Sequence, residues 1–508
     1  MERPGSRTSA EQNDDIADLA KGGRTNFFGF LLRLIARVPF LFIAGRLYGP
    51  TELGRFALAI LVLEFAAQLA TFGLKRGLAQ QLSRNERPHV HIVWDALLIA
   101  AIASAVAAAI LATLPQLMFP NSRINGLEQL LPLIIFAIAW SDVSLAALAY
   151  RHDVAATVRA RAIVEPWTIS IAAFGFYFYS QRDGLILAYA LSMAAALAAS
   201  LYPFIRAYGL PRDWRPEPRP LFAIARRNMP LAAADAIEWA TRNVDRFILG
   251  LFFAPAVVGV YWVAQQIVTL PQKLKTSFDP ILGPVITQNL EAGNKAAVAQ
   301  QVRQVGFWII AAQAGIALSL SIPGEAVMGL AGPEFVGGSA ALGILLLAEV
   351  VAATAVVSEA ALIYIARHRN LMISLATIGL QVGLSFAFVL GARAARLPVA
   401  VQAIGPALAL PVALGFASVA KSRLLSHLLG APVSGWRWAL IWASAVAAVV
   451  GFVAIQVPEW LELTVGLPLI LLSYGLVIWF KGFTPEDRVL FRLGGGKAGL
   501  ADAASSNR

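Results

Sequence analysis

The sequence predicts an all-α polytopic membrane protein with 14 transmembrane helices, arranged as two pseudo-symmetric six-helix bundles plus a C-terminal helix pair. Three observations predict this fold class. The 508-residue chain is 58% hydrophobic and only 14% charged, whereas soluble proteins carry about a quarter charged residues. Apolar runs of about 20 residues, the length that crosses a bilayer, recur along the whole chain. Basic residues gather in every second loop between these runs.

The apolar runs define the helices in order. We expect them near residues 27–47, 52–73, 92–114, 127–150, 161–180, 183–205, 228–252, 255–274, 302–322, 337–364, 370–391, 397–420, 436–456 and 460–480. With the N-terminus in the cytoplasm, about 31 of the 41 Lys and Arg residues fall inside and about six outside. A miscounted helix would reverse this pattern, so the asymmetry supports fourteen spans with both termini cytoplasmic.

The polar breaks predict the domain boundaries. Residues 1–26 read as a cytoplasmic tail, 27–206 as an N-terminal six-helix bundle, 207–227 as a cytoplasmic linker, 228–420 as a C-terminal six-helix bundle, 436–480 as an extra helix pair and 481–508 as a second cytoplasmic tail. The two bundles share a pattern, since "YGPTELGRFALAILV" and "FAPAVVGVYWVAQQIV" align at an offset of about 205 residues. Six helices separate the copies, which predicts parallel repeats. Two unrelated turns of the common Gly-Pro type are the alternative.

Several functional classes are disfavoured by what the sequence lacks. It contains no cysteine, and therefore no disulfide or thiolate metal site. Its five histidines form no metal-ligand motif, and it shows neither a nucleophile constellation nor a P-loop. We therefore expect no catalytic residue, no metal, no bound cofactor and no enzymatic activity. Without a basic soluble domain, nucleic acid is not an expected partner.

The predicted span 228–252 carries an unusual set of ionisable residues. At 100° per residue, all five fall within an arc of roughly 100°: Asp235, Glu238, Arg242, Asp245 and Arg246. A charge at the bilayer centre costs about 2.5–3.5 kcal/mol on insertion scales, so this stripe predicts a water-filled cavity at the midplane. The alternative is that these groups pair among themselves and lock the bundles together.

Two arginines in the first span, Arg33 and Arg37, lie four residues apart with no acid beside them in that span. An arginine does not deprotonate in proteins, so these two must meet water, a carboxylate or an anionic ligand. Guanidinium groups bind phosphate or an acidic sugar in a bidentate manner. The acids could bind sugar hydroxyls, or one could take up a proton and couple transport to a gradient. We expect lone polar groups in other spans to form helix-to-helix hydrogen bonds: Asp142, Gln265, Gln266, Glu349 and Glu359. Glu64 and Gln68 could extend the polar wall.

Three stretches resemble one known family. "NVDRFILGLFFAPAVVGVYWVAQQIVTL" is similar to the start of its second bundle, "RLYGPTELGRFALAILVLEFAAQLATFGLKRGLAQQLSR" to its first hairpin and "GPEFVGGSAALGILLLAE" to its entry into helix ten. The family is the Wzx-type lipid-linked oligosaccharide flippases, which are related to multidrug exporters and to the lipid II flippase.

The resemblance implies a flippase in the bacterial inner membrane. It implies that a polyprenyl-pyrophosphate-linked oligosaccharide moves from the cytoplasmic to the periplasmic leaflet by alternating access, for exopolysaccharide or O-antigen assembly. Membrane lipids, a polysaccharide polymerase and a chain-length regulator are the implied partners, and H⁺ or Na⁺ could drive turnover. The implied pyrophosphate-binding residues are Arg33, Arg37, Arg242 and Arg246, whereas Asp235 and Glu238 match no family motif.

Two other functions remain as alternatives. An ion-coupled multidrug or small-molecule exporter would share the fold, although a drug site favours aromatic and acidic residues without arginines. A membrane polymerase or ligase of the same glycan pathway would show a large periplasmic loop, and every predicted periplasmic loop here is short.

Overall fold

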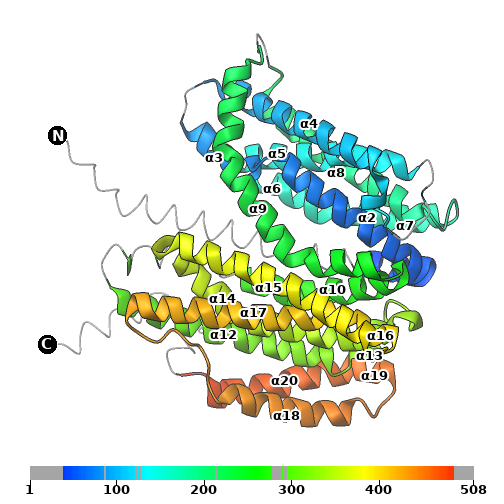
Figure 1. Ribbon diagram of the computed structural model, residues 1–508, viewed down its shortest axis with the longest axis vertical. Coiled ribbons are helices and arrows are strands. Elements are labelled where there is room, and N and C mark those ends of the chain that lie inside the picture. Colours follow the sequence, from blue (N-terminus) through cyan, green and yellow to red (C-terminus); the bar gives the residue numbers. More distant parts are fainter. Residues whose placement is uncertain are drawn as a thin grey trace. The chain divides into compact units, whose positions relative to one another are not determined.

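The structure is a computed structural model that describes residues 38–484, apart from 85–86, 121–123, 125–126, 212–213, 277–285, 287–288 and 291–293. Every regular element in these residues is a helix (Figure 1), which confirms the predicted all-α class. Arg33, Arg37 and the predicted tail 1–26 lie outside the described residues, as does most of the tail 481–508.

The chain separates into two compact units. The first comprises Met1–Leu270, Val327–Leu345 and Ser374–Ala413, and the second comprises Pro271–Ala326, Leu346–Ile373 and Leu414–Arg508. The unit boundaries fall inside several helices, so these units are not the predicted bundles. The division into bundles at 27–206 and 228–420 with an extra pair at 436–480 stays a prediction.

The first unit contains most of the N-terminal half. Its elements are η1 (Ala44–Tyr48), α2 (Gly49–Ala70), α3 (Leu74–Ser83), α4 (His89–Thr113), η2 (Pro115–Leu117), η3 (Glu128–Leu133), α5 (Ile134–Tyr150), α6 (Val154–Val158), η4 (Arg159–Val164), α7 (Glu165–Tyr177), α8 (Gly184–Tyr208), α9 (Pro218–Phe252), most of α10 (Pro255–Thr276), η5 (Pro333–Gly338) and α16 (Val399–Ala403). Helix α2 lies at its centre and packs against α4, α5, α8 and α9. Leu53, Leu61 and Leu63 of α2 are fully buried, so this helix forms the core of the unit.

The second unit is built on α12 (Lys295–Ser321), α18 (Ala439–Ala454) and α20 (Leu467–Val477), which pack against one another. Their buried core includes Phe307, Ala443 and Ile470. The unit also contains α19 (Glu459–Leu461), η6 (Glu462–Gly466) and η7 (Ile478–Gly482). Four further helices run through the boundaries between the units: α13 (Gly324–Gly329), α14 (Ser339–Ile365), α15 (Arg367–Ala394) and α17 (Gly405–Leu429). Asn294 caps α12, because its side chain accepts a hydrogen bond from the Ala297 N–H at 3.1 Å.

The helices fit a membrane protein. Nine helical segments of the described chain are long and apolar enough to cross a bilayer, and the first of them, Val38–Ser83, covers parts of two predicted spans. Helix α9 is not among the nine because its ionisable side chains lower its hydropathy. The membrane class is confirmed, and the count of fourteen spans stays a prediction.

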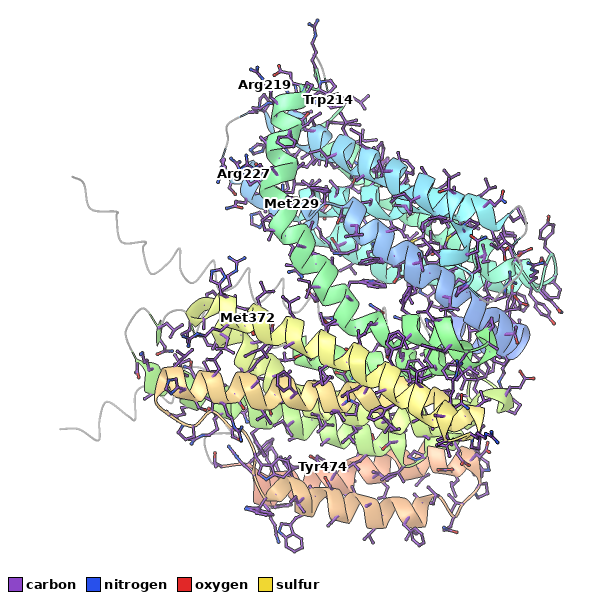
Figure 2. The ribbon with its side chains drawn as sticks, viewed as in Figure 1. Trp214, Arg219, Arg227, Met229, Met372 and Tyr474 are labelled. Atoms are coloured by element: carbon purple, nitrogen blue, oxygen red, sulfur yellow. The ribbon has the colours of Figure 1, made fainter. Side chains whose placement is uncertain are left out.

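Two elements differ from the sequence expectation. Residues 74–83, expected as part of a cytoplasmic loop, form the short helix α3. Helix α9 begins at Pro218, ten residues before the predicted span and inside the predicted linker 207–227. The linker residue Trp214 is also held in place, since its indole N–H donates to Asp95 at 2.9 Å. Arg219 and Arg227 follow it along the first turns of α9 (Figure 2).

The two copies of the predicted repeat contact each other directly. A Cβ atom added at Gly54 would overlap the carbonyl oxygen of Pro255, and one added at Gly259 would overlap that of Pro50. These pairs share the offset of 205 residues that relates the two sequence motifs. The contact is therefore reciprocal, as expected for two elements related by a pseudo-twofold axis. Glycine is required at both positions because α2 and α10 approach backbone to backbone.

Candidate functional site

Helix α3 is placed against α9 by a tight turn and two glycines. After α2, Phe72 and Gly73 adopt positive φ angles of 51° and 70°, and the chain turns directly into α3. A Cβ atom at Gly73 would come within 2.8 Å of the Asn228 carbonyl oxygen, and one at Gly77 would overlap the Asn228 side chain. This close packing holds the basic pair at the start of α3 beside the acidic residues of α9.

The first ion-pair group joins α3 to α9. Arg76 lies 3.0 Å from Asp235, between Nε and Oδ1, and 2.6 Å from Glu238, between Nη2 and Oε2. Arg242 lies 2.8 Å from the other carboxylate oxygen of Glu238. The Asp235 side chain is 1% exposed, whereas those of Arg76, Glu238 and Arg242 are 52%, 45% and 49% exposed. The Asp235 carboxylate is thus buried, and the other three side chains are about half exposed.

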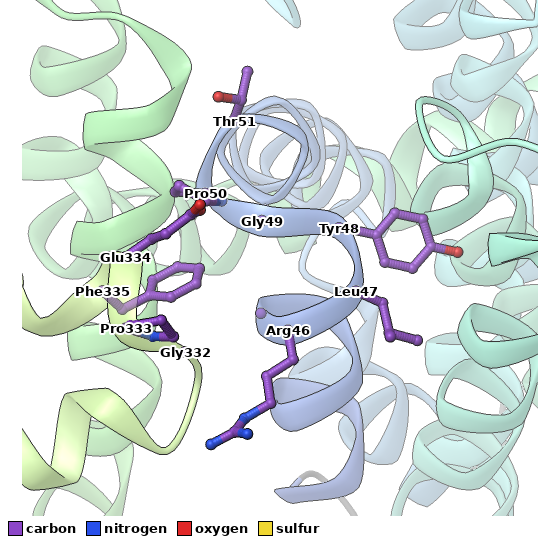
Figure 3. Close-up of a pocket in the computed structure, with 11 residues that line it drawn as sticks. Arg46, Leu47, Tyr48, Gly49, Pro50, Thr51, Gly332, Pro333, Glu334 and Phe335 are labelled. Atoms are coloured by element: carbon purple, nitrogen blue, oxygen red, sulfur yellow. The ribbon is translucent and has the colours of Figure 1, made fainter.

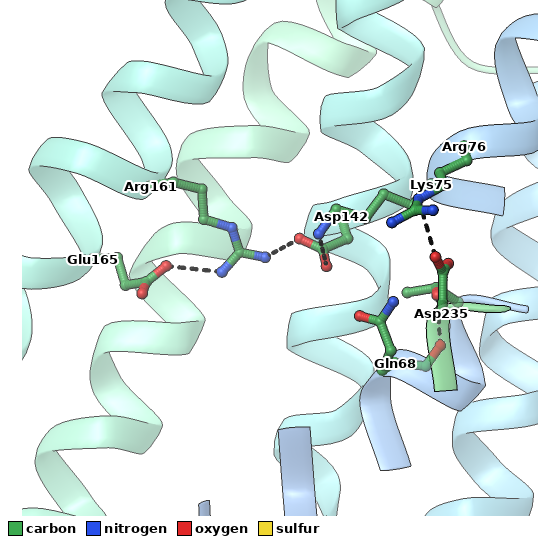
Figure 4. Close-up of polar contacts among 8 residues, drawn as sticks. Gln68, Lys75, Arg76, Asp142, Arg161, Glu165 and Asp235 are labelled. Carbon is green, nitrogen blue, oxygen red and sulfur yellow. Dashed lines mark hydrogen bonds and ion pairs between the residues drawn. The ribbon is translucent and has the colours of Figure 1, made fainter. Parts of the chain in front are cut away.

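The second ion-pair group extends the first one to α5 and α7. Lys75, the neighbour of Arg76, lies 3.4 Å from Asp142. Asp142 also pairs with Arg161, which lies 2.8 Å from Glu165. Figure 4 shows this chain of contacts, with Gln68 of α2 beside Asp235. We call the eight ionisable residues of both groups the charged cluster: Lys75, Arg76, Asp142, Arg161, Glu165, Asp235, Glu238 and Arg242. It has four acidic and four basic members, so its formal charge is balanced.

A third polar group lies further along α9. Asp245 is buried and accepts hydrogen bonds on Oδ2 from the Tyr261 hydroxyl at 2.5 Å and from the Gln265 amide at 2.8 Å. Its Oδ1 accepts from the Arg246 backbone N–H at 2.9 Å. The Arg246 guanidinium donates to the Asn243 side chain. These bonds link α9 to α10, so this group has the contacts of a helix-to-helix lock.

The structure divides the predicted stripe of α9 into two levels. Asp235, Glu238 and Arg242 belong to the charged cluster, whereas Asp245 and Arg246 belong to the group facing α10. Because a helix rises 1.5 Å per residue, ten residues separate the two aspartates by about 15 Å along the axis. Asp235 and Asp245 therefore belong to two separate groups, although they share one face of α9. The substrate-binding role assigned to these residues from sequence stays a prediction.

Sequence reasoning did not find the basic residues that face the acids of α9 and α5. Lys75 and Arg76 fall in the cytoplasmic loop expected between spans 52–73 and 92–114, and Arg161 falls at the cytoplasmic end of the expected span 161–180. One signal could have indicated α3, because the turn residue Gly73 directly precedes "LKRGLAQQLS", a segment with leucines four residues apart. No comparable local signal indicated which acids these side chains would meet.

The lone polar groups of other spans behave as predicted where the structure describes their partners. Asp142 and Gln265 bond across helices as given above. In the second unit, Glu349 accepts a hydrogen bond from Gln272 at 2.8 Å, and Glu359 lies 2.9 Å from Lys421. These contacts support the helix-to-helix interpretation. Gln68 lies beside the charged cluster, in line with its predicted place in the polar wall.

A separate pocket lies at the start of α2. It has a volume of about 560 Å³ and lies between residues 45–51 and 332–335. Its charged lining residues are Arg46 and Glu334 (Figure 3), and Arg46 Nε donates to the Leu330 carbonyl at 3.3 Å. Eighteen residues of α2 separate Pro50 from Gln68, about 27 Å along the helix. This pocket is therefore distinct from the charged cluster.

Long apolar helices that carry a partly exposed charged cluster are typical of membrane transporters, in which ionisable side chains often mark transport pathways. Comparison with known protein families identifies the family to which the chain belongs. The family model described as "Polysaccharide biosynthesis protein" matches residues 43–318, more than half of the chain, and the protein belongs to this family. Comparison with curated protein sequences finds no match.

Solved structures show the fold. Lipid II flippase MurJ, in an inward closed conformation, is similar with a TM-score of 0.64 at 13% identity, over 93% of this chain and 100% of that one. An inward-facing multidrug resistance MATE family transporter of the MOP superfamily gives 0.61 at 15% identity, over 78% and 94%. A MOP superfamily transporter from Pyrococcus furiosus gives 0.55 at 14% identity, over 81% and 96%.

The chain thus belongs to a polysaccharide biosynthesis family, and its fold is similar to that of solved flippases and exporters. The resemblance to Wzx-type flippases that the sequence motifs indicate is confirmed at this level. The protein is a multi-pass membrane protein of polysaccharide biosynthesis.

Proposed function

We propose that the protein is a flippase that moves a polyprenyl-pyrophosphate-linked oligosaccharide from the cytoplasmic to the periplasmic leaflet for surface polysaccharide assembly. The observation that carries the proposal is the state of Arg76 and Arg242. Both guanidinium groups share the carboxylate of Glu238, and all three side chains are about half exposed. They can therefore reach a ligand without unfolding any part of the chain.

Another arginine of the first unit shows the contrasting arrangement. Arg55 is 7% exposed, lies 2.6 Å from Glu52 and also pairs with Glu128, whose side chain is fully buried. Such a sealed pair stabilises packing and offers nothing to a ligand. The exposure of Arg76 and Arg242 is what distinguishes the charged cluster from a structural ion pair.

The substrate's pyrophosphate can replace the Glu238 carboxylate as the partner of Arg76 and Arg242. A pyrophosphate presents several oxygens to two guanidinium groups, and guanidinium binds phosphate through two parallel hydrogen bonds. Glu238 is half exposed, so it can give up its two arginines and be solvated by water. The glycan would then interact with nearby polar groups such as Gln68, and its lipid chain would remain in the bilayer.

The setting of this transport cycle is part of the proposal. The protein would lie in the bacterial inner membrane with both termini cytoplasmic, and Lys75 and Arg76 would meet the substrate on the cytoplasmic side. Arg33 and Arg37 would contribute further positive charge. A gradient of H⁺ or Na⁺ would drive turnover, and a polysaccharide polymerase and a chain-length regulator would receive the product.

Replacement of Arg242 by Ala tests the proposal. Because Glu238 keeps Arg76 as its partner, we expect a normal amount of folded protein but at least a tenfold loss of surface glycan, with lipid-linked oligosaccharide accumulating in cells. Arg226→Ala is the matched control, since Arg226 lies on the same helix and is exposed. Full glycan output from the Arg242→Ala variant would refute the assignment of this site.

The balanced charge of the cluster favours one alternative, an ion-coupled exporter of small cationic molecules. In that function Asp235 and Glu238 would hold the cargo. Deletion of the protein would then sensitise cells to cationic drugs and leave surface glycan intact, which is the opposite of the result expected for a flippase.

A further inference from the structure

We infer that the junction between α14 and α15 binds the phosphate groups of anionic phospholipids through Arg367, His368 and Arg369. This inference goes beyond the proposed function and does not depend on it, because it needs only the membrane class of the protein. It adds an interaction surface for lipid headgroups at a defined place in the second unit.

The junction lies at one surface of the bilayer. Pro333–Ile365 and Arg367–Ala394 are both long and apolar enough to cross a membrane, and only Ala366 separates α14 from α15. The Asn370 side-chain amide donates to Glu359 at 3.3 Å, so residues from the two sides of the junction are in contact and the chain reverses direction there. Because both helices cross the hydrocarbon core, their junction falls at the level of the lipid headgroups.

The first turn of α15 carries three consecutive side chains that can bind an anion. Arg367, His368 and Arg369 are all exposed, and none of them forms an ion pair with an acidic residue in the part of the chain that the structure describes. Positive side chains are unfavourable in a first turn, because the N-terminus of a helix carries a partial positive charge. An external anion removes this repulsion, since it is attracted by the side chains and by the helix end together.

Exposed apolar side chains adjoin this basic turn. Met372, near the start of α15 (Figure 2), is 68% exposed, and Leu371 is exposed as well. With 3.6 residues per turn, both fall on the side of α15 that lies between Arg367 and Arg369. Tyr364 at the end of α14 is 57% exposed, and tyrosine is enriched where the hydrocarbon meets the headgroups. A soluble anion would meet only the charges, whereas a phospholipid covers the arginines with its phosphate and the apolar side chains with its acyl chains.

The basic turn is held in place without using its own charges. Lys421 of α17 has a side chain that is 5% exposed, and it lies 2.9 Å from Glu359. Because Glu359 also accepts the bond from Asn370, these three residues join α17, α14 and α15 beside the junction. The one acid close to the turn is therefore already paired, and Arg367 and Arg369 keep their guanidinium groups for a phosphate, which each can bind through two parallel hydrogen bonds.

The lipid preference of this surface can be measured with one label, because the chain contains no cysteine. The variant Tyr364→Cys carries a single fluorophore beside the basic turn. The labelled full-length protein is placed in nanodiscs that contain an equal share of either brominated phosphatidylglycerol or brominated phosphatidylcholine, and quenching of the fluorophore gives the relative occupancy of the two lipids. We expect phosphatidylglycerol to be preferred by at least about fivefold at low salt, and we expect the preference to fall as the ionic strength rises.

Two double variants of the labelled protein separate this surface from a general effect of charge. Arg367→Gln with Arg369→Gln should abolish the preference for phosphatidylglycerol. Arg219→Gln with Arg226→Gln removes the same charge from exposed positions of α9 and should keep the preference. Equal quenching by the two lipids before these changes, or an unchanged preference after the α15 changes, would overturn the inference. Quenching by neither lipid, together with protection of the label from iodide in native membrane vesicles, would show that a protein covers the surface instead. All of these results would leave the flippase proposal standing.

Discussion

The contact between Arg76 and Asp235 makes a quantitative prediction about stability. Arg76→Ala removes the cation and leaves a carboxylate with 1% exposure. Exposed ion pairs contribute about 0.2–1 kcal/mol, and loss of one partner from a fully buried pair costs about 3–5 kcal/mol. Because Arg76 is 52% exposed and Asp235 is buried, the cost should fall between these limits, at about 2 kcal/mol. This corresponds to about a 30-fold change in the unfolding equilibrium.

The measurement is the free energy of unfolding in mixed micelles at about pH 7.5, for the parent and for Arg76→Ala. If an unpaired buried carboxylate causes the loss, Asp235→Asn should restore most of the stability in the Arg76→Ala background. Lower pH should also reduce the loss, by up to about 1.4 kcal/mol per pH unit, because a protonated Asp235 needs no cation. Arg226→Ala should change nothing.

Two results would refute this reasoning. The first is a stability of Arg76→Ala equal to that of the parent, which would mean that Asp235 finds another partner. The second is an unchanged loss in the double variant with Asp235→Asn, which would assign the effect to packing of the Arg76 side chain.

Two further predictions concern packing and the buried hydrogen bonds. Gly54→Ala places a methyl group against a backbone carbonyl of α10, and it should destabilise the protein by about 1–3 kcal/mol in thermal unfolding. The control is Gly175→Ala, where the added methyl group would lie in open space; it should be neutral or slightly stabilising. Tyr261→Phe removes the 2.5 Å hydrogen bond to the buried Asp245 and should cost about 1–3 kcal/mol; an equal loss for Tyr179→Phe, whose side chain is exposed, would argue against a specific role of that bond.

Many helices could be predicted because the bilayer thickness sets the length of a span, and the hydropathy of a span is determined by consecutive residues. The predicted spans 183–205 and 255–274 correspond to Gly184–Tyr208 and Pro255–Thr276. Helix α3 was missed because its charges and its length of ten residues are typical of a loop. The early start of α9 was missed because prolines usually break helices, although a proline at the first helical position is favourable, as at Pro218.

The candidate site was only partly predictable. The charges of α9 were visible because they interrupt an apolar run, and all five lie in one helix. Their partners were not visible, because Arg76 and Arg161 reach Asp235 and Asp142 through tertiary packing. The turn at Gly73 and the close approach of Gly77 to α9 decide which charges meet, and neither contact has a signature in the spacing of the residues concerned.

The length of α9 has a mechanical consequence. Its 35 residues, with Pro230 inside the helix, follow a helical path of about 52 Å, well beyond the roughly 30 Å thickness of a hydrocarbon core. Seventeen residues, or about 26 Å, lie between Asp235 and the end at Pro218, and Pro230 lies within this stretch, so the N-terminal part of α9 can bend at this proline independently of the charged cluster.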